Sequence, residues 1–106
     1  MAHSISGNGN TLIIRVYDRL DANSAPEIED EIADKLGGVT DLTVDLQGVN
    51  YVSSLGLRLL LSLQKRMYKQ GDMRVINVCD SVMELLEDTG FTQLMAISPA
   101  GSNASM

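Results

Sequence analysis

Two adjacent serines, Ser53 and Ser54, are the side chains best placed for chemistry in this chain. They stand between an apolar, strand-like run that ends at Leu46 and the longest helical pattern of the sequence. Hydroxyl groups here lie at a helix N-terminus, where backbone N–H groups lack partners and the helix dipole is positive. Such a place suits a negative group, including a phosphate. We therefore expect one serine to cap the helix, and a capping serine to be a candidate for covalent modification.

The residues that follow the serines favour a docking surface at the same place. Gly56 lies in the first turn of the expected helix, where glycine costs up to about 1 kcal/mol against alanine. Close approach of a partner's backbone would explain this glycine, and so would packing against the following strand. Leu55 and Leu59 share a helix face beside Ser54, either as partly exposed contacts or as core residues. A phosphate on Ser54 would add roughly −1.5 to −2 charge and block such a surface through repulsion and desolvation.

Other catalytic and metal chemistry lacks its usual residues. The single histidine, His3, stands in a terminus that we expect to be mobile, which leaves no base for a nucleophilic triad. The single cysteine, Cys79, ends an apolar strand and is expected in the core. The sequence contains no spaced Cys and His ligands and no glycine-rich phosphate loop. We expect no enzyme activity, no cofactor and no metal, with an enzyme or nucleotide-binding domain as a minor alternative.

Size and charge narrow the class of partner. The 106 residues suit one domain, and because only 4% are aromatic, Ile, Leu, Val and Met must fill its core. No apolar run reaches the roughly 20 residues of a membrane span, and no signal pattern opens the chain. The net charge of −6 argues against nucleic acid and anionic membranes but leaves protein partners open. Together with the single cysteine, these features predict a cytoplasmic protein.

Hydrophobic periodicity predicts the elements that position the serines. Strands are expected over residues 11–17, 40–46 and 73–78, with a short hairpin strand at 4–6 and a strand or helical turn at 94–97. Helices are expected from Ser24 to the Gly37-Gly38 pair, over residues 55–70, and from Ser81 to Gly90. Ser24 and Ser81 are each followed three residues later by Glu, which predicts a capping box.

This alternation predicts an α/β fold, with a mixed sheet of four to five strands and helices packed mainly on one face. Residues 1–97 are expected to form the single domain. Residues 98–106 are small and polar, which predicts a disordered tail.

The stretch VDLQGVNYVSSLGLR, from Val44 to Arg58, resembles the signature of the STAS domain, the fold of bacterial anti-sigma factor antagonists. The segment LDANSA, residues 20–25, resembles the family's loop before the first helix, and Thr89-Gly90-Phe91 resembles the turn after the short helix. The resemblance covers roughly residues 4 to 97. It implies a small mixed sheet with helices largely on one side.

The resemblance also implies a function. In the antagonists, a serine at the N-terminus of the main helix is phosphorylated by a partner anti-sigma factor with Ser/Thr kinase activity. The unmodified form binds that partner and frees a sigma factor, and a metal-dependent Ser/Thr phosphatase restores it. Without gaps the phosphoacceptor falls on Ser54, interpreted as a helix cap that can be charged. Ser53, where many antagonists carry Asp, is the alternative acceptor.

The expected partner-binding surface lies around this serine, because Asp21 and Asn23 match the loop that the family places beside the acceptor. The surface comprises Asp21, Asn23, Ser53, Ser54, Leu55, Gly56, Arg58 and Leu59. The alternative function is a STAS regulatory or scaffold subunit of a transport or other signalling complex that works without phosphorylation.

Overall fold

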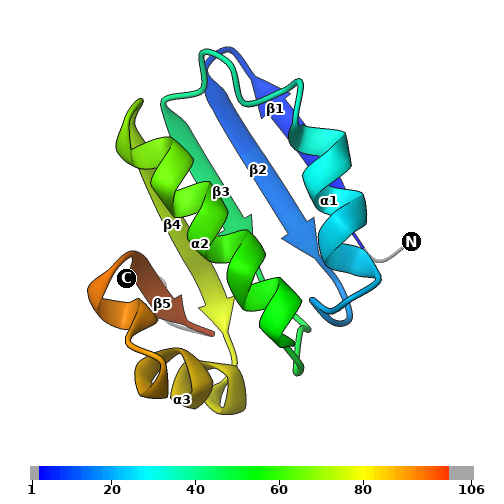
Figure 1. Cartoon of the computed structure of the whole chain (residues 1–106), viewed down its shortest axis with the longest axis vertical. Coiled ribbons are helices and arrows are strands. Elements are labelled where there is room, and N and C mark those ends of the chain that lie inside the picture. The colour runs from blue at the N-terminus through cyan, green and yellow to red at the C-terminus, as the bar shows by residue number, and fades with distance from the viewer. Residues whose placement is uncertain (1–2, 101–106) are drawn as a thin grey trace.

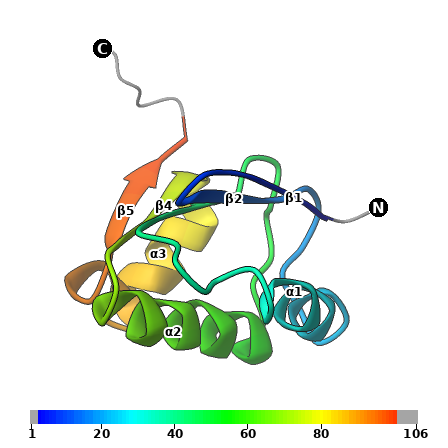
Figure 2. The same ribbon diagram turned by 90° about the horizontal axis from the view of Figure 1, so that it is seen from above.

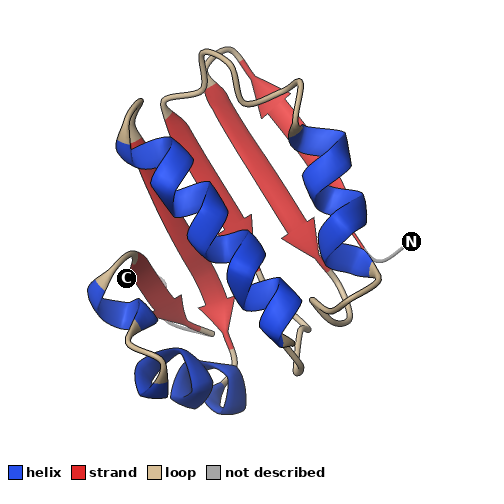
Figure 3. Ribbon diagram, viewed as in Figure 1, coloured by secondary structure: helices blue, strands red, loops and turns tan. Residues whose placement is uncertain are grey.

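The computed structural model describes residues 3–100 of the chain. Its elements, in chain order, are β1 (His3–Asn8), β2 (Thr11–Val16), α1 (Ser24–Ile32), β3 (Asp41–Asp45), α2 (Ser54–Tyr68), β4 (Asp72–Val78), α3 (Asp80–Asp88), the 3-10 turn η1 (Phe91–Gln93) and β5 (Ala96–Pro99). The strands form one sheet in the order β1-β2-β3-β4-β5 (Figures 1 and 3). β1 is antiparallel to β2, and the other neighbours are parallel. The predicted mixed α/β sheet is therefore confirmed.

Helices α1 and α2 lie side by side on one face of the sheet, and α3 lies near β4 and β5 (Figure 2). Along β2, Leu12, Ile14 and Val16 are buried, while Arg15 between them is exposed. This alternation is the period of a strand with one face packed against a core. Aliphatic residues dominate that core, as the composition requires. No helix among the described residues is long and apolar enough to cross a membrane.

The N-terminal hairpin holds the histidine that we expected to be mobile. β1 pairs with β2 from the very start of the described chain, with His3 opposite Val16. His3 is 7% exposed, and its Nε2 lies 2.8 Å from Oε1 of Glu31 in α1. The predicted hairpin strand is confirmed, but the expectation of a mobile His3 is wrong because strand pairing and α1 both fix it.

The helices form where periodicity predicts them but have different ends. α1 ends at Ile32 rather than at the Gly37-Gly38 pair. The Lys35 N–H donates to the Ile32 carbonyl at 2.8 Å, which replaces the α-helical pattern with a tighter turn. Leu36 and Val39 then enter the core as the chain turns toward β3. α2 begins one residue earlier and ends two residues earlier than predicted.

Neither predicted capping box forms. Ser24 is the first residue of α1, and Ser81 is the second residue of α3, so neither is in the cap position. The residue before α3 is Cys79, which follows β4 and is half-buried against the core rather than fully buried in it. The capping role of both serines was predicted wrongly because each lies within the helix and not before it.

The domain extends further toward the C-terminus than residue 97. β5 runs parallel to β4 with Ile97 beside Val75, and the Ala100 N–H donates to the Val78 carbonyl at 2.8 Å. Ser98 and Pro99 therefore belong to the sheet and not to the expected tail, because β4 offers them a pairing edge. The rest of that expected tail, residues 101–106, lies outside the described residues.

Candidate functional site

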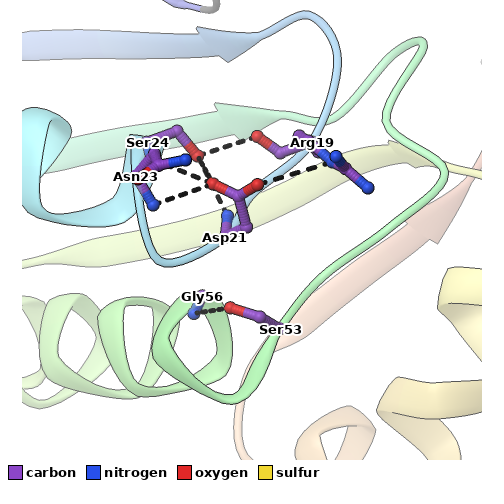
Figure 4. Close-up of polar contacts among 6 residues, drawn as sticks. All are labelled: Arg19, Asp21, Asn23, Ser24, Ser53 and Gly56. Atoms are coloured by element: carbon purple, nitrogen blue, oxygen red, sulfur yellow. Dashed lines mark hydrogen bonds and ion pairs between the residues drawn. The ribbon is translucent and has the colours of Figure 1, made fainter.

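Two loops meet beside the N-terminus of α2. Leu20, in the loop after β2, forms a parallel bridge with Val52, which precedes α2. The Leu20 N–H donates to the Tyr51 carbonyl at 3.0 Å, and the Ser53 N–H donates to the Leu20 carbonyl at 2.9 Å. Leu20 is 1% exposed, so its side chain anchors the contact in the core. This pairing places the Asp21 loop against the start of α2 (Figure 4).

Asp21 organises the loop that leads into α1. Its Oδ1 accepts from the N–H groups of Asn23 at 2.9 Å and Ser24 at 3.1 Å (Figure 4). The Ala25 N–H donates to the Asp21 carbonyl at 2.9 Å, which continues the helical turn. The carboxylate thus does the capping that we predicted for Ser24. The Ser24 hydroxyl instead donates to the Arg19 carbonyl and accepts from the Asp21 N–H.

The same hydrogen bonds lower the pKa of Asp21. The Ser24 N–H has the largest effect, the Asn23 N–H the next, and the Arg19 guanidinium adds a smaller one. The Arg19 Nε lies 3.4 Å from Asp21 Oδ2, and its guanidinium lies 5.0 Å from the ring centroid of Tyr51. Because the ordinary value is already 3.8, Asp21 carries a full negative charge at neutral pH.

The two serines occupy different positions at the start of α2. Ser53 is the N-cap: its backbone is extended, and its Oγ accepts from the Gly56 N–H at 3.3 Å (Figure 4). Ser54 is the first helical residue, is exposed, and its hydroxyl makes no hydrogen bond to any described residue. The interpretation of Ser54 as the helix cap is therefore wrong, since Ser53 has that role. The Ser54 hydroxyl stands free at the helix N-terminus.

Two residues expected to contact a partner are buried inside the domain. A Cβ at Gly56 would lie 2.4 Å from the Leu20 carbonyl oxygen and 3.0 Å from Cγ1 of Val52. Neither a partner's backbone nor the following strand explains this glycine, because the loop after β2 occupies that space. Leu59 is 5% exposed and belongs to the core. Gly56 and Leu59 thus support the surface from below and do not form it.

The accessible residues around the free hydroxyl form what we call the Ser54 surface: Asn23, Ser54, Leu55 and Arg58. Leu55 is 37% exposed, and Arg58 is exposed with no ion-pair partner among the described residues. Leu55 and Arg58 line a shallow hollow whose far wall includes Pro26 at the start of α1. The hollow therefore lies between the first turns of α1 and those of α2. Asp21 is half-buried in the loop before α1.

Neither a cluster of metal ligands nor a histidine lies at the Ser54 surface in the part of the chain that the structure describes. Within residues 3–100 there is no group of three or more His, Cys, Asp and Glu that could hold a metal ion. His3, the only histidine, is held against α1 by Glu31. Among the described residues, the Ser54 hydroxyl therefore has no histidine beside it.

Sequence reasoning missed the residues that hold the two loops together. Leu20 joins loops that are far apart in the chain, and the Arg19–Tyr51 contact spans the same distance. Periodicity carries no signal for such pairing. Only the likeness of the LDANSA segment to a family loop indicated that Asp21 lies near the serines.

Comparison with known proteins shows relatives along nearly the whole chain. A family model described as the STAS domain matches residues 3–104. An anti-sigma-B factor antagonist of Staphylococcus aureus is 29% identical over 87 residues, which cover 80% of this chain and 81% of that protein.

Solved structures share the fold. An anti-sigma-factor antagonist (STAS) domain protein from Planctomyces limnophilus superposes with a TM-score of 0.79 at 20% identity, covering 95% of this chain and 92% of that one. The Bacillus cell fate determinant SpoIIAA in its phosphorylated form gives a TM-score of 0.73 at 19% identity, covering 91% and 90%. At these identities the structures speak to the fold alone.

Proposed function

Because the chain belongs to the STAS domain family, we propose that it is an anti-sigma factor antagonist whose binding is switched by phosphorylation of Ser54. The observation that carries the proposal is the free Ser54 hydroxyl, exposed at the N-terminus of α2 while Ser53 serves as the cap. The name of the Staphylococcus aureus relative supports the antagonist role. The phosphorylated form of SpoIIAA, a protein of the same fold, supports the modification.

In the unmodified state the Ser54 surface binds the anti-sigma factor. Leu55 offers apolar area, Arg58 offers an unpaired cation, and the ionised Asp21 holds the neighbouring loop in shape. The hydrogen bond from the Ser53 N–H to the Leu20 carbonyl holds the two loops together before the partner binds. A surface that is already ordered loses less conformational entropy on binding.

Phosphorylation changes the charge of this surface and leaves the fold in place. The N–H groups of Ser54 and Leu55 donate to no described residue, so a phosphate on Ser54 meets unused donors at a positive helix end. The phosphate adds roughly −1.5 to −2 charge beside a partner-facing leucine. Docking then requires desolvation of that charge, and the complex separates.

The proposed partners follow from this switch. The kinase is an anti-sigma factor with Ser/Thr kinase activity. A metal-dependent Ser/Thr phosphatase removes the phosphate and restores binding. The site of action is the cytoplasm, where sigma factors meet RNA polymerase.

The test is phosphorylation by the cognate anti-sigma factor kinase, with ATP and mapping of the phosphate by mass spectrometry. We expect one phosphate on Ser54, none on a Ser54→Ala variant, and normal labelling of Ser53→Ala. Binding of the kinase should weaken at least about tenfold for Ser54→Asp, through the added charge. Labelling on neither serine, with unchanged binding of Ser54→Asp, would instead favour a STAS subunit that works without phosphorylation.

A further inference from the structure

A groove lies beside the C-terminal half of α2, where η1 packs next to it. It encloses about 650 Å³. The two most exposed large apolar side chains of the described chain line it: Tyr68 at 84% and Leu94 at 54%. We call this the basic groove and define it by Leu61, Lys65, Arg66, Tyr68, Lys69 and Leu94.

The cations of the basic groove have no carboxylate partner. The chain carries eight Lys and Arg residues against 14 Asp and Glu. Three of the arginines, at positions 15, 19 and 74, pair with aspartates. Lys65, Arg66 and Lys69 form no ion pair with any residue in the described range. An acidic protein therefore gathers three unpaired positive charges at one groove.

The helix dipole accounts for only part of this arrangement. Cations in the last turn of α2 suit its negative end. The dipole gives no reason for Tyr68 and Leu94 to remain exposed beside them. Exposed apolar side chains beside unpaired cations are typical of a surface that binds a peptide.

We propose that the basic groove docks an acidic segment of another protein, with one large apolar side chain held between Tyr68 and Leu94. Carboxylates on either side of that anchor face Lys65, Arg66 and Lys69. Charge complementarity selects this occupant over a basic or neutral one. The net charge of −6 repels an acidic segment from the protein as a whole, so the local cluster of three cations is what favours its binding at this groove.

The basic groove is independent of the proposed phosphorylation switch. An α-helix rises about 1.5 Å per residue, so Tyr68 lies roughly 20 Å along α2 from Ser54. That separation exceeds the Debye length of about 8 Å at physiological ionic strength. A phosphate on Ser54 should therefore leave binding at the groove unchanged, and one partner can stay attached through the groove while the Ser54 surface is released.

The test uses a fluorescein-labelled amphipathic peptide that has two leucines flanked by four glutamates, followed by fluorescence anisotropy. Lys65→Glu/Lys69→Glu should weaken its binding at least about tenfold, because attraction becomes repulsion. Lys35→Glu is the control, since it reverses an exposed cation that lies outside both the groove and the Ser54 surface, and should change affinity less than about twofold. Equal loss in both variants, or equal binding of the peptide with glutamines for glutamates, would overturn the proposal.

Two further measurements keep the test decisive. Leu94→Ala removes an exposed anchor contact without changing charge and should also weaken binding, even where the double charge reversal disturbs folding. In ¹⁵N–¹H spectra the peptide should shift amides around Leu61, Tyr68 and Leu94. Shifts centred on Ser54 instead, no binding at millimolar peptide, or a dimer of the chain that the charge reversal dissociates would each contradict an acidic partner in the groove.

Discussion

The Cα of Gly56 packs against the backbone carbonyl of Leu20, so closely that a β-carbon at position 56 would lie 2.4 Å from that oxygen. The same carbonyl accepts the N–H of Ser53 at 2.9 Å. The Leu20 carbonyl therefore accepts the N–H of the N-cap residue of α2 and also fills the space beside the first turn of that helix. The position of the Ser54 hydroxyl relative to the Asp21 loop depends on this contact.

Replacement of Gly56 by alanine should destabilise the domain, although the same change usually stabilises a helix. The helix propensity gain is up to about 1 kcal/mol, but the methyl group would collide with backbone and not with a flexible side chain. Overpacking of this kind costs about 1–3 kcal/mol, so we expect a net loss on the order of 1 kcal/mol or more. Urea denaturation followed by circular dichroism measures the difference.

Gly37 gives the matched control for this substitution. A Cβ there would meet nothing within 4 Å, and its φ lies outside the left-handed region. Gly37→Ala should change the free energy of unfolding by less than about 0.5 kcal/mol. An unfolding midpoint for Gly56→Ala at or above that of the wild type would show that the loop yields without cost.

Replacement of Ser53 should lower the stability of the domain, whereas replacement of Ser54 should abolish phosphorylation and leave stability unchanged. Ser53→Ala removes the cap of α2 and should cost about 1 kcal/mol, toward the lower half of the usual range because the bond to the Gly56 N–H is 3.3 Å long. Ser54→Ala removes no hydrogen bond to a described residue and should leave the thermal midpoint almost unchanged. Calorimetry of both variants, beside the phosphorylation assay, checks this. A greater loss of stability in Ser54→Ala would reverse the assignment of the cap.

Much of the fold could be predicted from hydrophobic periodicity alone. The strands around Ile14, Val44 and Val75 largely alternate fully buried residues with less buried ones, and the four-residue spacing of Ile28 and Ile32 marks α1. These patterns depend only on which face of an element is buried. They therefore gave the α/β class and the side of the sheet that carries the helices.

The details of the site could not be predicted in the same way. The cap of α1 was assigned to the wrong residue because Asp21, three residues before Ser24, supplies the capping oxygen through a turn that the motif does not encode. His3 was expected to be mobile because its anchor, Glu31, lies on a different element. Gly56 indicated a close backbone approach, yet only the folded chain identifies Leu20 as the neighbour. Each miss involves a tertiary contact that sequence spacing does not record.

Replacement of Leu55 should weaken kinase binding without loss of stability, whereas replacement of Leu59 should destabilise the fold. Leu55 is 37% exposed, so Leu55→Ala should leave stability nearly unchanged while weakening kinase binding roughly fivefold, about 1 kcal/mol. Leu59 is 5% exposed, and Leu59→Ala should cost about 2–5 kcal/mol of folding free energy through the cavity it leaves. Isothermal titration calorimetry and urea denaturation measure the two effects. Unchanged kinase affinity in Leu55→Ala would remove this leucine from the proposed interface.

The contribution of Asp21 to stability should depend on pH in one direction. Hydrogen bonds from the Ser24 and Asn23 N–H groups hold its pKa below the ordinary value of 3.8, so the folded state favours the ionised carboxylate. Its contribution is fully present above pH 3.8 and is lost as the pH falls through the lowered folded pKa. Asp21→Ala should thus be less stable than the wild type at pH 7, and this difference in unfolding free energy should narrow in strongly acidic solution.

Asp18→Ala is the control, because this exposed carboxylate accepts no hydrogen bond from a described residue, and its difference from the wild type should stay small throughout. Urea denaturation from pH 7 to pH 3 or below follows both variants; a difference for Asp21→Ala that stays constant over this range would mean that the carboxylate's charge does not hold the loop.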